Sequence, residues 1–319
     1  MAEDNRYFSF DKGIVTLMYH RFNESKYPST NIQMDIFEKQ IEIIEKSDAT
    51  FINPKDLDSE FSKVHKTKLI LLTIDDGFSS FYNNAWPFLK SKKIPFILFI
   101  STREVGKFGY MSWNQIREIQ NSNIGVIGNH SHSHDYLVDF NNGKIKKDID
   151  QSIKIFKKEI GYNPTYFSYP FGEYSSDFIN IIKNNFNFAF GQHSGVLHSE
   201  ENFFALPRYP LVANFSDLAR FRTVVDSLPL PVTDIVPINP LIKENPPLLG
   251  FTISADLGPL QQLACYLARS GKLNLEQLGP NRIEVRFLKP LEKGRSRINC
   301  TLPGQSGRWR WFGMQLLVP

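Results

Sequence analysis

Two adjacent carboxylates stand at the end of an apolar stretch in the first third of the chain. The residues from Leu69 to Ile74 read Leu-Ile-Leu-Leu-Thr-Ile, and Asp75, Asp76 and Gly77 follow directly. Two carboxylates side by side at the edge of a core repel each other and lose solvation, which costs free energy. A bound cation would remove that cost, so the pair indicates a cation site.

Histidines that could complete such a site occur further along the chain. The segment from His130 to His134 reads His-Ser-His-Ser-His. Imidazole and carboxylate are ligands that borderline divalent metals accept. His130 and His134 would lie on one side of a helical turn or a tight loop. We expect His132 to lie behind the site or at the surface. Acids and imidazoles together predict a metal-dependent hydrolase, although the His-rich segment alone would also suit an ordinary polar loop.

Apolar, β-rich runs alternate with helical patterns up to about residue 226. The expected strands are 14–19, 69–74, 95–100, 124–128, 165–169, 188–190 and 203–206. Strands this uniformly apolar are buried on both faces, as parallel strands covered by helices are. About seven such β/α units predict an α/β fold, a (β/α)7-like distorted barrel, over residues 1–226.

The polar residues able to do chemistry come directly after these apolar runs. In barrels of parallel strands the active site lies at the C-terminal ends of the strands. The sequence therefore predicts that one end of the barrel brings together His20, Asp75, Asp76, His130, His134 and Tyr169.

The chain changes character after the predicted barrel. Residues 227–248 contain many prolines and predict an extended linker. Residues 249–319 alternate polar and apolar positions, which predicts a small β-rich, sandwich-like domain with a short helix near 259–268. Trp309 and Trp311 lie on one face of a predicted strand there, either in the core or on a sugar-binding surface.

The composition is that of an ordinary globular protein. The 319 residues are 41% hydrophobic and 22% charged, with a formal net charge of +4. Without a clustered basic patch this charge does not indicate a nucleic-acid partner, and we expect none. No apolar run approaches the roughly 20 residues of a membrane-spanning helix, so we expect no transmembrane segment.

Cysteines and the N-terminus bear on the cellular compartment. Cys265 and Cys300 could form one disulfide, which would favour an exported protein, or remain two buried thiols. The first residues are polar and form no signal peptide, and we expect that a native leader has been removed before Ala2. A periplasmic or extracellular location is therefore expected, and a cytoplasmic one stays open.

Three motifs in sequence order resemble those of a known family. They are Thr73-Ile-Asp-Asp-Gly-Phe78, Asn129-His-Ser-x-x-His134 and Tyr169-Pro-Phe-Gly172. The region from about 13 to 225 resembles the polysaccharide deacetylases, carbohydrate esterase family 4. Leu17-Met-Tyr-His20 and Phe37-x-x-Gln40 are most similar to the branch that deacetylates poly-N-acetylglucosamine in biofilm matrices.

The resemblance implies roles for individual residues. Asp76, His130 and His134 would bind one divalent metal ion, Zn²⁺ by default, with Co²⁺ or Ni²⁺ also suited to these ligands. Asp75 would be the general base that accepts a proton from water. The oxyanion would be stabilised by the metal and by a backbone N–H near Phe171.

Two departures from the family pattern leave roles open. Many members carry an arginine in the third motif that steadies the catalytic aspartate, and Ser168 stands there in this chain. Arg208 could reach Asp75 from another strand, or could form a surface ion pair. The usual late Leu-x-His motif of the general acid is not evident; His20 is the favoured substitute, and His193 is its rival.

The resemblance implies hydrolysis of the acetamide of N-acetylated hexosamine units in a glycan, with release of acetate. One alternative keeps the fold but acts on a small non-sugar amide, which would need a closed pocket rather than an open groove. Another is a catalytically silent carbohydrate-binding protein. The complete acid and histidine set argues against the silent protein.

Overall fold

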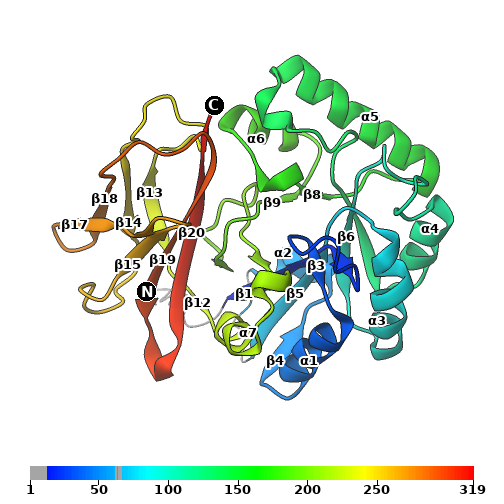
Figure 1. The fold of residues 1–319 in the computed structure, drawn as a ribbon, viewed down its shortest axis with the longest axis horizontal. Helices are drawn as coiled ribbons and strands as arrows, with labels where there is room; N and C mark the ends of the chain where they lie inside the picture. The colour runs from blue at the N-terminus through cyan, green and yellow to red at the C-terminus, as the bar shows by residue number, and fades with distance from the viewer. Residues whose placement is uncertain (1–12, 62, 64–66) are drawn as a thin grey trace, which may run out of the picture.

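A curled, mostly parallel sheet forms the core of the N-terminal part of the protein (Figure 1). The structure is a computed structural model that describes residues 13–61, 63 and 67–319. Along the sheet the strands follow the order β10 (Val196–Leu197), β1 (Ile14–Tyr19), β5 (Lys68–Ile74), β6 (Phe96–Ile100), β7 (Gly125–Asn129), β8 (Tyr166–Ser168) and β9 (Phe188–Phe190). All neighbours in this order are parallel except β1 and β10.

One segment near the end of the barrel links its two margins. Leu206 forms a parallel bridge with Phe190 of β9. A few residues later β11 (Tyr209–Pro210) pairs in parallel with β1. A further short strand, β4 (Ala49–Phe51), lies parallel to β5. The predicted (β/α)7-like distorted barrel is confirmed, and Arg208 lies in the segment that joins its margins.

Amphipathic helices connect the strands and cover the sheet. They are α1 (Met34–Glu45), α2 (Leu57–Glu60), α3 (Trp86–Lys92), α4 (Trp113–Asn121), α5 (Asn142–Ile160), α6 (Ser176–Ile182) and α7 (Leu218–Val225). Figure 1 shows α3, α4 and α5 on the outer side of the barrel. The buried stripe of α5 is the one its spacing predicts, with residues such as Ile145, Ile149 and Phe156 facing inward.

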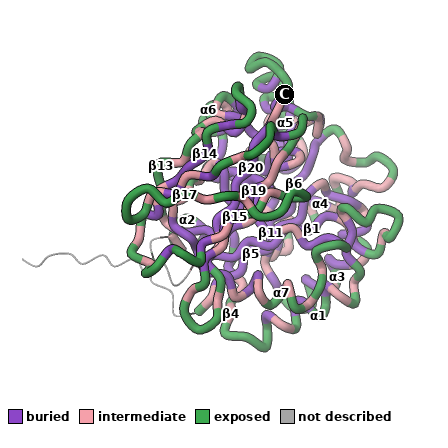
Figure 2. The backbone as a smooth tube through the Cα atoms, turned by 60° about the vertical axis from the view of Figure 1, so that its left-hand side comes forward, coloured by how far each residue is buried: buried purple, intermediate pink, exposed green. Residues whose placement is uncertain are grey.

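The strands are buried on both faces, as parallel strands between a core and a helical layer must be. All six residues of β1 and all five of β6 are buried. Figure 2 shows the same contrast, with buried strands inside and exposed segments on the surface. Such a core is close-packed and rigid, so the loops at the strand ends start from fixed positions.

The C-terminal part is a β-sandwich of two sheets. One sheet has the order β12 (Leu228–Pro229), β20 (Trp309–Val318), β19 (Gly294–Pro303), β15 (Ala264–Leu267) and β16 (Gly271–Lys272). The other has the order β13 (Val232–Val236), β14 (Leu249–Ile253), β18 (Arg282–Arg286) and β17 (Asn274–Leu278). Side chains of both sheets share one apolar core, and the expected β-rich fold is confirmed.

Two expectations about this region, the extended linker and the short helix, need revision. The stretch 227–248 includes β12, which pairs with β20, and β13, which pairs with β14. We therefore propose that the sandwich begins near Leu228 and that the proline-rich stretch is part of it. The short helix predicted near 259–268 is wrong: residues 264–267 form β15, because they pair with β19 along a full register.

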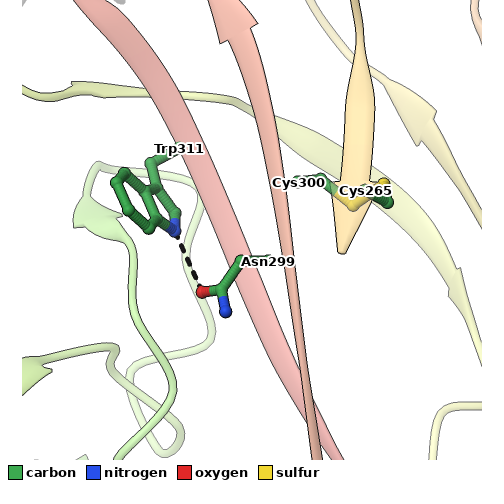
Figure 3. The surroundings of a disulfide bond; sticks show 4 residues. All are labelled: Cys265, Asn299, Cys300 and Trp311. Atoms are coloured by element: carbon green, nitrogen blue, oxygen red, sulfur yellow. Dashed lines mark hydrogen bonds between the residues drawn. A yellow bond between two sulfur atoms is a disulfide. The ribbon is translucent and has the colours of Figure 1, made fainter. Parts of the chain in front are cut away.

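A disulfide joins two neighbouring strands of the sandwich. Cys265 on β15 and Cys300 on β19 lie opposite each other in the register, and their Sγ atoms are bonded. Figure 3 shows this disulfide and, on the other side of the β19 and β20 pair, Trp311 with its Nε1–H donating to Asn299 Oδ1 at 3.1 Å. Of the two open alternatives for the cysteines, the structure has the bonded one.

The described residues include no helix that is both long and apolar enough to cross a membrane. The expectation about a leader concerns residues 1–12, which lie outside the described part of the chain.

Candidate active site

The two acids follow β5 in a turn of unusual backbone conformation. The Asp75 N–H donates to the carbonyl of Tyr19 at 2.9 Å, so the turn begins as a continuation of the sheet. Asp76 and Gly77 then have φ values of 73° and 70°. A Cβ atom at Gly77 would lie 2.5 Å from Cδ1 of Ile100, and the positive φ would strain any other residue, so glycine is favoured. The glycine of the Asp-Asp-Gly motif thus suits the turn in which the two carboxylates lie.

The histidine loop follows β7, and Asp148 of α5 binds its backbone. The His130 N–H donates to the carbonyl of Ile100 at 2.9 Å. The carboxylate of Asp148 accepts hydrogen bonds from the N–H groups of His132 at 2.8 Å and Ser133 at 3.0 Å. His134 has a φ of 54°. These bonds fix a tight loop rather than a helical turn between the two predicted ligands.

Asp76, His130 and His134 converge on one point. Oδ1 of Asp76 lies 3.3 Å from Nε2 of His130 and 3.1 Å from Nε2 of His134. One ligand atom from each of the three residues lies within 4.8 Å of the others. Carboxylate oxygen and imidazole nitrogen at such separations could share one metal ion.

The protonation pattern of His130 supports a metal-binding role. Its Nδ1 lies 2.7 Å from the carbonyl oxygen of Ser168, which can only accept a hydrogen bond. Nδ1 therefore carries the proton and Nε2 presents a lone pair, as in metal-binding histidines. Both His130 Nε2 and Asp76 Oδ1 are buried without a hydrogen-bond partner. Buried polar atoms of this kind normally have a partner, and a cation would satisfy them.

Electrostatics keep Asp76 in the form that binds cations. Burial raises its pKa, but the nearby imidazoles of His130, His134 and His20 outweigh burial and hold the pKa well below its usual value. Asp76 is therefore a carboxylate at neutral pH.

Asp75 is bound by Arg208 in a buried, bidentate ion pair. Arg208 donates from Nη1 to Oδ1 at 2.7 Å and from Nη2 to Oδ2 at 2.8 Å. The same guanidinium donates to Ser168 Oγ at 2.8 Å, to Thr73 Oγ1 at 3.2 Å and to the carbonyl of Gly191 at 2.9 Å. Both partners are fully buried, so the alternative of a surface ion pair is wrong.

Arg208 also determines the charge and orientation of Asp75. Burial raises the pKa of the Asp75 carboxyl, but the charge of Arg208 and its hydrogen bonds hold the pKa below its usual value. Oδ2 of Asp75 lies 3.9 Å from His20 Nε2 and 4.0 Å from His130 Nε2. The carboxylate is therefore ionised and turned toward the histidines.

The two histidines considered for the general acid lie in different places. His20 follows β1, is 7% exposed, and faces Asp75. Burial lowers its pKa, against the opposing charges of Asp76 and Asp75. His193 lines a separate cavity between the barrel and the sandwich, with Tyr174 and Trp311 among its walls. The geometry favours His20, and the role itself remains a proposal.

Phe171 lies in the turn after β8, next to a predicted metal ligand. Its φ and ψ are 58° and 3°, a left-handed conformation that is uncommon for a phenylalanine. Its ring stacks on Tyr136 at a centroid distance of 4.0 Å and packs edge-on against His134 at 4.8 Å. The side chain of Phe171 is thus next to one of the three metal-ligand candidates, His134.

An open cleft adjoins the candidate metal position. Its walls include the following residues: Asp76, Phe78, Ser101, Arg103, Glu104, Tyr110, Ser133 and His134. Of the three ligand candidates, Asp76 and His134 line the cleft and are accessible from it. Phe108 and Tyr136, each two residues along the chain from a wall residue, are exposed.

Sequence reasoning missed residues that position the site without touching a substrate. Asp148 lies on the lysine-rich helix α5, and its carboxylate holds the histidine loop. Thr73 was quoted only as part of a motif, and its hydroxyl donates to the carbonyl of Leu17 while accepting from Arg208. His132 bonds Thr102 at 2.8 Å and is not among the three ligand candidates.

Comparison with known proteins identifies a family that part of the chain resembles. Residues 62–186 match the family model described as polysaccharide deacetylase, and this region contains the acid pair and the histidine loop. Over this region the chain is similar to the polysaccharide deacetylases. The resemblance inferred from the three motifs is confirmed.

Individual proteins and solved structures are similar to the chain as well. Poly-beta-1,6-N-acetyl-D-glucosamine N-deacetylase of Staphylococcus aureus (strain MRSA252) is 23% identical over 228 residues, covering 62% of this chain and 78% of the relative. The structure of IcaB from Ammonifex degensii aligns with a TM-score of 0.60 and 26% identity, over 66% of this chain and 96% of that one. Streptococcus pyogenes deacetylase PplD aligns with a TM-score of 0.59 and 21% identity, over 64% and 94% of the two chains.

Proposed function

We propose that this protein is a metal-dependent deacetylase that hydrolyses the acetamide of N-acetylated hexosamine units in a glycan. The products are acetate and a free amine on the sugar. The observation that carries the proposal is the convergence of Asp76, His130 and His134 beside an ionised Asp75 that Arg208 holds in place. This is the arrangement that metal-assisted amide hydrolysis requires.

Asp76, His130 and His134 would hold the metal, since each presents one ligand atom to a common point. Zn²⁺ suits two imidazoles and one carboxylate, and Co²⁺ or Ni²⁺ suits them as well. When bound, such an ion acidifies water and polarises the substrate carbonyl.

The chain's own residues would move the protons. Oδ2 of Asp75 accepts a proton from the attacking water, and Arg208 keeps that carboxylate ionised and correctly turned. His20 Nε2 lies 3.9 Å from the same oxygen and would donate a proton to the leaving nitrogen. The backbone N–H of Phe171 donates a hydrogen bond to the developing oxyanion.

A β-1,6-linked N-acetylglucosamine polymer is the proposed substrate class. Support comes from the Staphylococcus aureus relative, whose name gives that polymer, and from the open cleft beside Asp76. A polymer needs an open groove, whereas a small amide would be better held in a closed pocket. We also propose an exported location, since a disulfide such as Cys265–Cys300 forms and persists in oxidising compartments.

Acetate release from a panel of amides tests this proposal. We expect metal-loaded protein to release acetate from β-1,6-linked N-acetylglucosamine oligomers faster than from the monosaccharide or from small non-sugar N-acetyl amides. Preference for the small amides would replace the glycan proposal with the amidohydrolase alternative. Oligomer binding without acetate release from any substrate would indicate the silent carbohydrate-binding protein.

A further inference from the structure

Two side chains of the C-terminal sandwich bind the backbone of the turn that contains Phe171. Arg295 on β19 donates from Nη1 to the carbonyl oxygen of Phe171. Gln315 on β20 donates from Nε2 to the carbonyl oxygen of Gly172. These strands are neighbours in one sheet, and they are more than a hundred residues away from the turn in sequence.

Further contacts hold the flanks of the same turn. Arg295 Nη1 also lies 3.5 Å from a carboxylate oxygen of Glu173. Arg297, two positions along β19, donates from Nη2 to Gln192 Oε1 at 3.2 Å. The backbone of the sandwich approaches just as closely, because a Cβ atom at Gly313 would lie 2.0 Å from the carbonyl oxygen of Ser194. Only glycine fits there.

The sandwich is fixed to the barrel by packing as well as by polar contacts. Trp311 on β20 packs edge-on against Tyr209 of β11 at a centroid distance of 5.3 Å and lies against the barrel core. Figure 1 shows β20 on the side of the sandwich that faces the barrel. The sheet can therefore act as a rigid support for the turn.

The turn needs such support because of its backbone conformation. Phe171 has a φ of 58°, which a non-glycine residue adopts only when its surroundings stabilise it. Hydrogen bonds to the carbonyl oxygens of Phe171 and Gly172 fix two consecutive peptide groups, and thereby the direction of the preceding Phe171 N–H. A less constrained turn could point that N–H away from the reacting carbonyl.

We propose that Arg295 and Gln315 are positioning residues for the deacetylase reaction, and that the C-terminal sandwich is an integral support of the active site. This inference rests on the proposed function, because it assigns the held turn to oxyanion stabilisation. It differs from a sugar-binding role for the sandwich, since Trp311 is used in packing and in a hydrogen bond to Asn299.

Arg295→Ala tests the inference, with Arg286→Ala as the matched control. Arg295 is partly exposed, but its partner Glu173 has a side chain only 11% exposed and loses this ion pair in the variant. Gln315→Met leaves that pair intact and is therefore the second test variant. Arg286 lies on the other sheet of the sandwich, where its Nη2 pairs with Glu276 at 2.7 Å and away from the turn. We expect Arg295→Ala to lower kcat about 10–100-fold through misplacement of the oxyanion donor, with KM and metal affinity unchanged. Arg286→Ala should retain the wild-type kcat.

Amide hydrogen exchange over residues 169–173 gives a readout that does not depend on activity. Exchange in this segment should become faster in Arg295→Ala and in Gln315→Met, an apolar replacement of similar size, but not in Arg286→Ala. Unchanged exchange in both variants, or an unchanged kcat in an active protein, would overturn the inference. Wild-type protein without deacetylase activity would contradict the proposed function, while the exchange data would still decide whether the sandwich holds the turn.

Discussion

Replacing Asp75 by Asn is expected to lower the turnover of glycan deacetylation by about 10²–10⁴-fold, the usual contribution of a general base. The amide cannot accept the proton of the attacking water. Metal affinity should stay close to that of the wild type, because the predicted ligands are Asp76, His130 and His134. Steady-state acetate release and equilibrium metal binding are the two measurements. Folding is checked by circular dichroism at the assay temperature, since the variant leaves the Arg208 charge buried.

His20→Ala is the companion variant for the general acid. It should lower turnover while metal binding stays intact, and His193→Ala is its matched control because His193 lines a different cavity. Full activity of His20→Ala together with an inactive His193→Ala would reassign the acid. Loss of metal from Asp75→Asn would show that Asp75 is a ligand rather than the base.

Arg208→Met should lower the free energy of unfolding by about 3–5 kcal/mol, the usual cost of leaving one member of a buried ion pair without its partner. Both Arg208 and Asp75 have fully buried side chains, so water cannot replace the lost partner. Chemical denaturation of the metal-free protein measures the change without a contribution from metal binding. The same variant should also lose activity, because the orientation of Asp75 depends on the guanidinium.

A double variant separates the buried charge from simple loss of packing. Asp75→Asn combined with Arg208→Met removes both charges and should be more stable than either single variant. Arg286→Met is the surface control, and its exposed pair with Glu276 should be worth no more than about 1 kcal/mol. Arg208→Met within about 1 kcal/mol of the wild type would mean that this ion pair does not hold Asp75 in the way described here.

The parts of the site that lie at strand ends could be predicted from the sequence. Asp75, Asp76 and His130 each follow an apolar strand, and parallel neighbouring strands end on the same side of a sheet. Their convergence therefore follows from the order of strands and needs no knowledge of side-chain packing. The barrel was predictable for the same reason, since its strands are continuous apolar runs.

Contacts between segments that are far apart in the sequence were harder to predict. Arg208 could be recognised only as a side chain able to reach Asp75, because its burial depends on how the segment after β9 crosses to β1. Asp148 gave no signal at all, since an acid on a lysine-rich helix has the same sequence pattern whether or not it faces a loop.

The sandwich shows the same limit at a larger scale. Alternating polar and apolar residues predicted strands. The pairing of β12 and β13 with later strands is non-local, and the prolines in this stretch predicted a linker instead. The contacts of Arg295 and Gln315 with the turn at Phe171 depend on how the sandwich packs against the barrel. No local pattern in the sequence encodes that packing.

The central claim is that one divalent metal ion, held by Asp76, His130 and His134, is required for hydrolysis. The most direct measurement is acetate release from a β-1,6-linked N-acetylglucosamine oligomer after chelation, followed by titration with Zn²⁺ while bound metal is counted. We predict that activity disappears on chelation and returns in full with one equivalent of metal per chain, whereas Asp76→Ala neither binds that equivalent nor regains activity. Full activity of the metal-free protein, or of Asp76→Ala, would contradict the account.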